Sequence, residues 1–125
     1  VGVDPEGSIY SGDTPKAYQV EGIGYDFWPK VFDKSLVDRM IRIGDKESFF
    51  AARRLAKQEG ILAGGSTGSV AAGVRRLLAD LQAKGSLEGK VVVMMVHDGG
   101  RNYLSKFYND EWMIEKGYGL EGDQI

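Results

Sequence analysis

The chain has 125 residues, of which 42% are hydrophobic and 27% charged, and its formal net charge is −2. This length has room for one domain with a modest core, and the charge gives no electrostatic reason to expect nucleic acid or an anionic membrane as a partner. The absence of cysteine and the single histidine exclude disulfides and thiolate metal sites and leave too few ligands for a typical zinc site.

No apolar run approaches the roughly 20 residues that span a bilayer, and the N-terminus lacks the pattern of a signal peptide. We therefore expect a cytoplasmic protein with no membrane partner, no nucleic-acid partner and no metal site.

The first third of the chain predicts two strands and a long connection between them. Residues 1–4 have the pattern of the end of a buried strand, and residues 4–8 that of a turn. Proteins seldom begin within a strand, so we expect that an N-terminal portion precedes this chain. Residues 8–19 are polar and predict a surface loop, and residues 38–43 predict a short strand.

Two amphipathic helices are predicted next. Asp45 is a good N-cap for a helix over 46–59, which ends at Gly60. A glycine-rich turn at 64–68 then leads into a second helix that reaches about Lys84. The apolar side chains that recur at spacings of three and four on these helices are Phe49, Ala52, Leu55 and Ala56 on the first, and Val70, Val74, Leu77, Leu78 and Leu81 on the second.

Residues 90–96 are continuously apolar and rich in β-branched side chains, which is typical of a strand buried on both faces in the middle of a sheet. Met94 and Met95 are expected in the core. Helical segments at about 100–107 and 109–116 complete the chain. This alternation of strands and helices predicts an α/β layer structure with a mainly parallel sheet flanked by helices.

The segment Gly64-Gly65-Ser66-Thr67-Gly68-Ser69 opens directly onto the second helix. Backbone N–H groups and a hydroxyl at the positive end of a helix dipole can bind a polar small molecule. The structural alternative is that the glycines form a turn and that Ser66 or Thr67 caps the helix. The segment lacks the Gly-Lys-Ser/Thr ending of a Walker loop.

Two further segments are candidates for a site. Gly22 and Gly24 have no third glycine at the spacing of a dinucleotide fingerprint, so they indicate a backbone that approaches a ligand or another strand. Tyr25, which follows them, is more often a packed aromatic than a site residue. His97 and Asp98 follow the central strand, where open α/β sheets bind ligands, but adjacent side chains of an extended segment diverge and form no acid–base pair.

Together these segments resemble the cystathionine β-synthase and cysteine synthase family of fold-type II pyridoxal-phosphate enzymes, which implies part of a tryptophan synthase β-like fold. The resemblance covers nearly the whole chain, and Tyr25-Asp26 together with residues 109–113 resembles the cystathionine β-synthase branch. The matching segments are residues 1–8 (VGVDPEGS), 20–27 (VEGIGYDF), 64–69 (GGSTGS) and 98–106 (DGGRNYLSK).

The resemblance implies pyridoxal 5'-phosphate as the cofactor, with the Ser66 hydroxyl against its pyridine nitrogen. A neutral hydroxyl cannot hold a proton on the ring as an aspartate would, so the cofactor is a weaker electron sink. Gly22, Gly24 and Tyr25 would border the substrate pocket, and Asp98 would lie near the ring edge. The family often has proline where this chain has His97.

The family's Schiff-base lysine, phosphate-binding loop and substrate-carboxylate loop have no counterpart here, so this chain holds no catalytic residue of its own. We expect residues 1–118 to be the C-terminal segment of a catalytic core, residues 119–125 to be a tail or linker, and the chain to be inactive alone. The implied partners are amino-acid substrates, the N-terminal part of the same core and a second copy in a homodimer.

The implied reaction is a β-replacement that condenses L-serine with L-homocysteine to cystathionine. The alternatives are cysteine synthase activity with O-acetylserine and sulfide, and a non-catalytic ligand-binding module.

Overall fold

The computed structural model describes residues 1–121. Its sheet has two parallel strands, β1 (Gly2–Pro5) and β2 (Met40–Ile43), in the register Gly2↔Met40 to Pro5↔Ile43. The connection between them includes two short 3₁₀ turns, Ile9–Ser11 and Lys34–Leu36. The two strands predicted in the first third of the chain are confirmed, as is their parallel direction.

The first predicted helix is confirmed, with a different cap. α1 spans Asp45–Arg54 and continues as a turn of π-helix, Leu55–Glu59, which ends at Gly60 with φ +69°. The N-cap is Gly44, and Asp45 is the first helical residue. The predicted Asp45 cap is wrong because its carboxylate binds a distant part of the chain. The groups that donate to it are the backbone N–H of Gln19 (2.7 Å), the backbone N–H of Val20 (3.0 Å) and the Tyr118 hydroxyl (3.3 Å).

The second helix begins earlier than predicted. α2 spans Gly65–Ala83 with Gly64 as its N-cap, so residues 65–68 are helical rather than a turn, and no side chain caps the helix. The prediction that Ser66 or Thr67 is the cap is therefore wrong. Gly68 allows the close crossing of the two helices, because a Cβ placed there would lie 2.0 Å from the backbone oxygen of Ser48 in α1.

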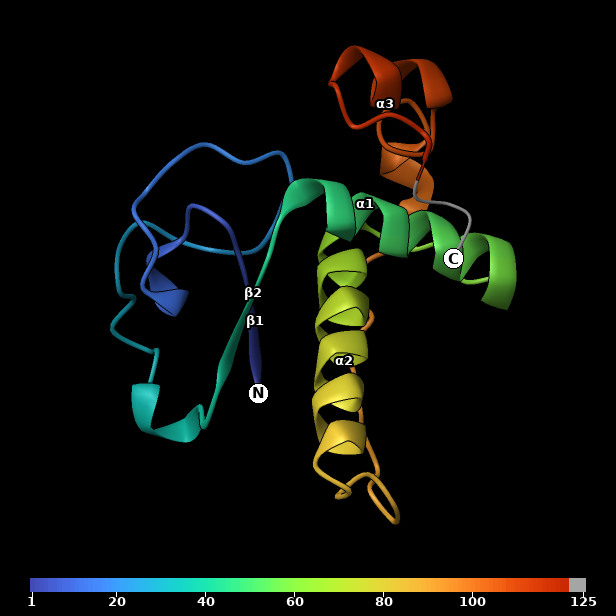
Figure 1. Ribbon diagram of the computed structural model, residues 1–125. Helices are drawn as coiled ribbons and strands as arrows, with labels where there is room; N and C mark the ends of the chain where they lie inside the picture. Colours follow the sequence, from blue (N-terminus) through green and yellow to red (C-terminus); the bar gives the residue numbers. More distant parts are fainter. Residues whose placement is uncertain (122–125) are drawn as a thin grey trace.

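The core consists of two clusters on opposite sides of α1. Figure 1 shows α1 between α2 and the C-terminal helices. One cluster faces the C-terminal segment, and the other joins α1 to α2 and β2. Their buried members are Val20, Phe49, Phe50, Ala52, Phe107 and Met113 in the first, and Ile41, Ile43, Ala51 and Ala72 in the second.

The segment 90–96 differs from its prediction. It forms no strand, since the sheet of the described residues contains only β1 and β2. Val91 and Val93 are each 89% exposed and Met95 is 66% exposed, whereas Met94 is half-buried. Within residues 1–121, no neighbouring strand pairs with the backbone of this run. The expected core position of Met94 and Met95 is wrong.

Of the two predicted C-terminal helical segments, the second is confirmed, whereas the first is helical only over residues 100–103 and continues as turns over 104–108. A 3₁₀ turn spans Gly100–Tyr103, and α3 spans Asp110–Glu115 with the Asn109 side chain accepting a hydrogen bond from the Trp112 N–H (3.1 Å). Among residues 1–121, no helix is long and apolar enough to cross a membrane, and no three histidine or carboxylate side chains gather at a possible metal site.

Candidate functional site

Ser66 lies in the first turn of α2 and is 6% exposed. The first N–H groups of an α-helix have no partner within the helix, and no side chain caps α2. Within residues 1–121, the Ser66 hydroxyl makes no hydrogen bond to protein, whereas the neighbouring hydroxyls of Thr67 and Ser69 do. A hydroxyl that lacks a partner therefore lies at the positive end of a long helix.

Segments 62–64 and 98–100 form a short antiparallel contact beside this turn. The Gly64 N–H donates to the Asp98 carbonyl (3.0 Å). The Asp98 carboxylate accepts a 2.6 Å hydrogen bond from the Tyr103 hydroxyl, and this bond is the main reason why the pKa of Tyr103 is raised to about 12. The contact brings Asp98 to the start of α2.

Two more contacts hold the same region. The Tyr108 hydroxyl donates to the Ala63 carbonyl (2.6 Å) and accepts from the Ala63 N–H (3.3 Å). The Thr67 hydroxyl accepts from the backbone N–H of His97 (3.2 Å). The C-terminal segment is therefore joined to both sides of Gly64.

The loop with Gly22, Gly24 and Tyr25 lies at the end of β1. Both glycines have positive φ, +84° and +78°, and a Cβ on Gly24 would lie 2.5 Å from the Pro5 ring. The backbone N–H of Tyr25 donates to the Ser8 hydroxyl (3.1 Å), while its ring is 47% exposed. Gly24 and Tyr25 line an open cavity of about 510 Å³. This loop can thus offer backbone groups and an aromatic surface to a ligand.

One ion pair links this loop to the C-terminal segment. The Lys106 ammonium binds the carboxylate of Glu21, which precedes Gly22. Among the described residues, no hydrogen bond joins Ser66 directly to the Gly22–Tyr25 loop. The structure therefore places Asp98 against Gly64, two residues before Ser66, and it connects the loop to this region through segment 98–106.

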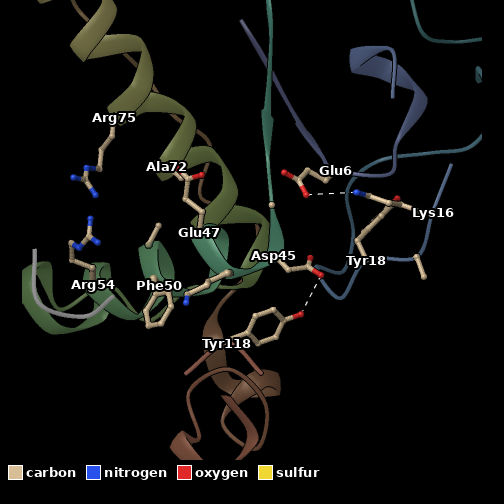
Figure 2. Close-up of a pocket in the computed structure, with 14 residues that line it drawn as sticks. Glu6, Lys16, Tyr18, Asp45, Glu47, Phe50, Arg54, Ala72, Arg75 and Tyr118 are labelled. Atoms are coloured by element: carbon tan, nitrogen blue, oxygen red, sulfur yellow. Dashed lines mark hydrogen bonds and ion pairs between the residues drawn. The ribbon is translucent and has the colours of Figure 1, made fainter. Parts of the chain in front are cut away.

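A larger cavity, of about 770 Å³, lies elsewhere. Figure 2 shows it at the N-terminal end of α1, where the Asp45–Tyr118 hydrogen bond and the Glu6–Lys16 ion pair border it and Arg75 of α2 faces it. Of the residues that the structure describes, none of the four predicted site residues lines it. The Ser66 hydroxyl and this larger cavity therefore lie at different places in the structure.

Sequence reasoning missed the two tyrosines that hold the Ser66 turn. Tyr103 lies in segment 98–106, which resembles the family. Its hydrogen bond to Asp98, five residues earlier, could not be predicted without knowing that a 3₁₀ turn lies between them. Tyr108 reaches the backbone of Ala63, 45 residues away in sequence, which no local pattern indicates.

Comparison with known proteins places these features in context. The family model described as "Pyridoxal-phosphate dependent enzyme" matches residues 1–99. The chain is 48% identical to cystathionine beta-synthase from Dictyostelium discoideum, with 94% of this chain and 24% of that protein covered. It is 46% identical to cystathionine beta-synthase from Oryctolagus cuniculus, with 100% of this chain and 23% of that protein covered.

A solved structure is also similar. The O-acetylserine dependent cystathionine beta-synthase from Helicobacter pylori matches with a TM-score of 0.69 and 40% sequence identity, covering 84% of this chain and 33% of that one. The chain thus spans about a quarter to a third of the length of these relatives.

Proposed function

Because this chain belongs to the family of pyridoxal-phosphate dependent enzymes, we propose that residues 1–118 are the C-terminal segment of the catalytic core of a β-replacement enzyme. Residues 119–125 would be a tail or linker, of which 122–125 lie outside the described residues. The observation that carries the proposal is the Ser66 hydroxyl, which has no hydrogen-bond partner among residues 1–121 and lies at the uncapped start of α2.

The residues present fit the cofactor's ring. A pyridine nitrogen is a hydrogen-bond acceptor, and Ser66 offers an O–H that no described residue uses. When bound, pyridoxal phosphate supplies the electron sink for chemistry at the substrate's α-carbon. Ser66 would donate a hydrogen bond to the ring nitrogen and keep its proton, because an alcohol is a far weaker acid than a pyridinium.

The substrate side of the proposal rests on the loop at the end of β1. Gly22 and Gly24 would present backbone groups to the amino-acid substrates, and the exposed ring of Tyr25 would form a wall of the pocket. We propose L-serine and L-homocysteine as the substrates and cystathionine as the product, since the chain is 48% and 46% identical to two cystathionine beta-synthases.

A second candidate differs in the amino-acid donor. The similar structure from Helicobacter pylori is described as O-acetylserine dependent, which favours an activated serine, and with sulfide as the thiol the reaction would be that of a cysteine synthase. Turnover measured with each donor, serine or O-acetylserine, against each thiol, homocysteine or sulfide, separates these reactions. Highest turnover with serine and homocysteine is the expected result.

The remaining parts of the enzyme are also proposals. The Schiff-base lysine and the phosphate-binding loop would come from the N-terminal part of the same core, so the present chain would be inactive alone. We expect a cytoplasmic homodimer. Borohydride reduction of the whole protein followed by mass spectrometry should find the cofactor on a lysine outside this chain. A protein with no such adduct would favour a non-catalytic ligand-binding module.

The Ser66 contact is tested by Ser66→Ala and Ser66→Asp in the whole enzyme, with Ser86→Ala as the control at the exposed far end of α2. We expect Ser66→Asp to hold a proton on the ring nitrogen, to change the visible absorption of the bound cofactor and to lower turnover by on the order of 100-fold. Unchanged absorption and turnover in both Ser66 variants would show that Ser66 does not touch the ring.

A further inference from the structure

The Asp98 carboxylate is fixed against the start of α2 by three features. Its Oδ2 accepts the 2.6 Å hydrogen bond from Tyr103, and its backbone carbonyl accepts from the Gly64 N–H (3.0 Å). Its Oδ1 lies so close to Gly64 that a Cβ placed there would be 1.9 Å away. Only glycine at the N-cap position leaves room for this carboxylate.

The charge of Asp98 has a defined effect at this position. α2 has 19 residues, no acidic residue in its first turn and no side-chain cap. The N-terminus of such a helix carries the equivalent of about half a positive charge. Asp98 brings a negative charge to this end from a segment that lies 34 residues later in the sequence, so it opposes the helix dipole within two residues of Ser66.

The other charged groups near this position are balanced or distant. Glu21 contributes to the raised pKa of Tyr103, but its own charge is paired with Lys106. The charges of Arg53 and Asp98 act on Tyr108 in opposite directions. His97 is adjacent in sequence, and its backbone N–H binds the Thr67 hydroxyl. Asp98 is thus the carboxylate in direct contact with the N-cap of α2.

We propose that Asp98 is a positioning residue that Tyr103 holds against Gly64, where its charge offsets the positive end of α2 and so sets how strongly a ring nitrogen accepts the Ser66 hydroxyl. This inference rests on the proposed Ser66 contact. Without Asp98, the positive end of α2 would be unopposed. It would disfavour positive charge on the ring and make the ring nitrogen a weaker hydrogen-bond acceptor. A ring nitrogen beside Ser66 would then take up a proton only at lower pH.

The experiment is a spectroscopic pH titration of the bound cofactor in the holoenzyme. Asp98→Asn removes the charge and keeps the shape, whereas Glu111→Gln removes an exposed carboxylate from the same C-terminal segment and is the matched control. We expect Asp98→Asn to lower the pH midpoint of the spectral change by on the order of 0.5 unit. Glu111→Gln should leave it unchanged.

Two further variants approach the same interaction from its partners. Tyr103→Phe keeps the carboxylate and removes the hydrogen bond that holds it, so we expect a smaller shift in the same direction. Gly64→Ala would displace the carboxylate from the N-cap and should shift the midpoint as Asp98→Asn does. These variants provide the measurement even if Asp98→Asn fails to fold. A purely structural role would change thermal stability without moving the midpoint.

The outcomes separate this inference from the proposed function. If Ser66→Ala changes the cofactor spectrum but Asp98→Asn and Gly64→Ala titrate like the wild type, the role of Asp98 is disproved and the ring contact stands. If the Ser66 variants leave the spectrum unchanged, the ring contact itself is wrong.

Discussion

Gly68 lies where the first turn of α2 crosses α1. The atoms nearest to a Cβ placed there are the Ser48 backbone oxygen at 2.0 Å and the Cβ and backbone nitrogen of Ala52 at 2.9 and 3.0 Å. Because these atoms belong to the α1 backbone or adjoin it, no side-chain rotation can relieve the overlap. The distance between the two helices, and hence the place of Ser66, depends on this missing side chain.

We therefore expect Gly68→Ala to lower the free energy of unfolding by about 1–3 kcal/mol, which is typical of overpacking. The control is Gly99→Ala, because the nearest atom to a Cβ at Gly99 is 4.0 Å away and its φ of −76° suits any residue. Urea denaturation of the two variants measures the difference. Equal stability would show that α1 and α2 can move apart without cost.

The Tyr103 phenol makes the free energy of unfolding depend on pH in the alkaline range. Its folded-state pKa is raised from 10.0 to about 12, mainly by the hydrogen bond to Asp98 and then by burial. Because the folded protein holds the phenol proton more tightly than the unfolded chain does, this stabilisation is complete below pH 10.0 and is lost as pH rises toward about 12. We expect the free energy of unfolding to fall over this window.

Tyr103→Phe should make that fall shallower, as measured by denaturation at successive pH values. Tyr118, whose pKa is also raised to about 12 by burial and Asp45, contributes to the part of the fall that remains, as do Tyr10, Tyr18 and Tyr108, whose pKa values are raised mainly by burial. A wild-type and a Tyr103→Phe protein with the same slope would contradict the proposed strength of the Tyr103–Asp98 bond.

Among the elements, those with a strong local pattern were predictable from sequence. β1, β2, α1, α2 and α3 all follow from apolar periodicity and turn residues. The errors arose where a distant contact decides the outcome. Asp45 has the pattern of a cap, but backbone donors at positions 19 and 20 take its carboxylate. Glycines at 64–68 suit a tight turn and a close helix crossing equally well, so only the position of α1 distinguishes the two.

The segment 90–96 is another place where the local pattern did not predict the structure. Its composition is that of a buried strand, yet Val91 and Val93 are almost fully exposed within the described residues. A cavity of about 250 Å³ separates residues 91–93 from Val1 and Val3, above the apolar side of α2. If the proposed N-terminal part of the core contributes a strand here, both the composition and the cavity are explained.

Hydrogen exchange tests this explanation. In the whole enzyme we expect slow exchange of the amides at 91–96, because strand pairing protects them. In the 125-residue chain they should exchange rapidly, and residues 40–43 of β2 are the internal reference because they are paired with β1. Rapid exchange at 91–96 in the whole enzyme would mean that no other strand covers this segment.

For the molecule as a whole, Phe49 connects the C-terminal segment to the start of α2. It is 1% exposed on α1, and its ring lies 4.8 Å from that of Phe107 in a stacked arrangement, 5.6 Å from Trp112 and 5.3 Å from Tyr118. A Cβ on Gly65, at the start of α2, would lie 3.3 Å from the same ring. One side chain thus supports the C-terminal segment and the turn that carries Ser66.

We expect Phe49→Ala to cost about 3–5 kcal/mol of unfolding free energy, because the cavity it leaves is enclosed by aromatic rings that cannot all move inward. Leu36→Ala is the control, since Leu36 is 78% exposed and its loss should change stability by less than about 0.5 kcal/mol. Hydrogen exchange in the Phe49→Ala variant should also accelerate at residues 100–118. This segment contains Tyr103, which donates the hydrogen bond to the Asp98 carboxylate. If exchange there stayed at the wild-type rate, the C-terminal segment would hold the Ser66 turn through its hydrogen bonds alone.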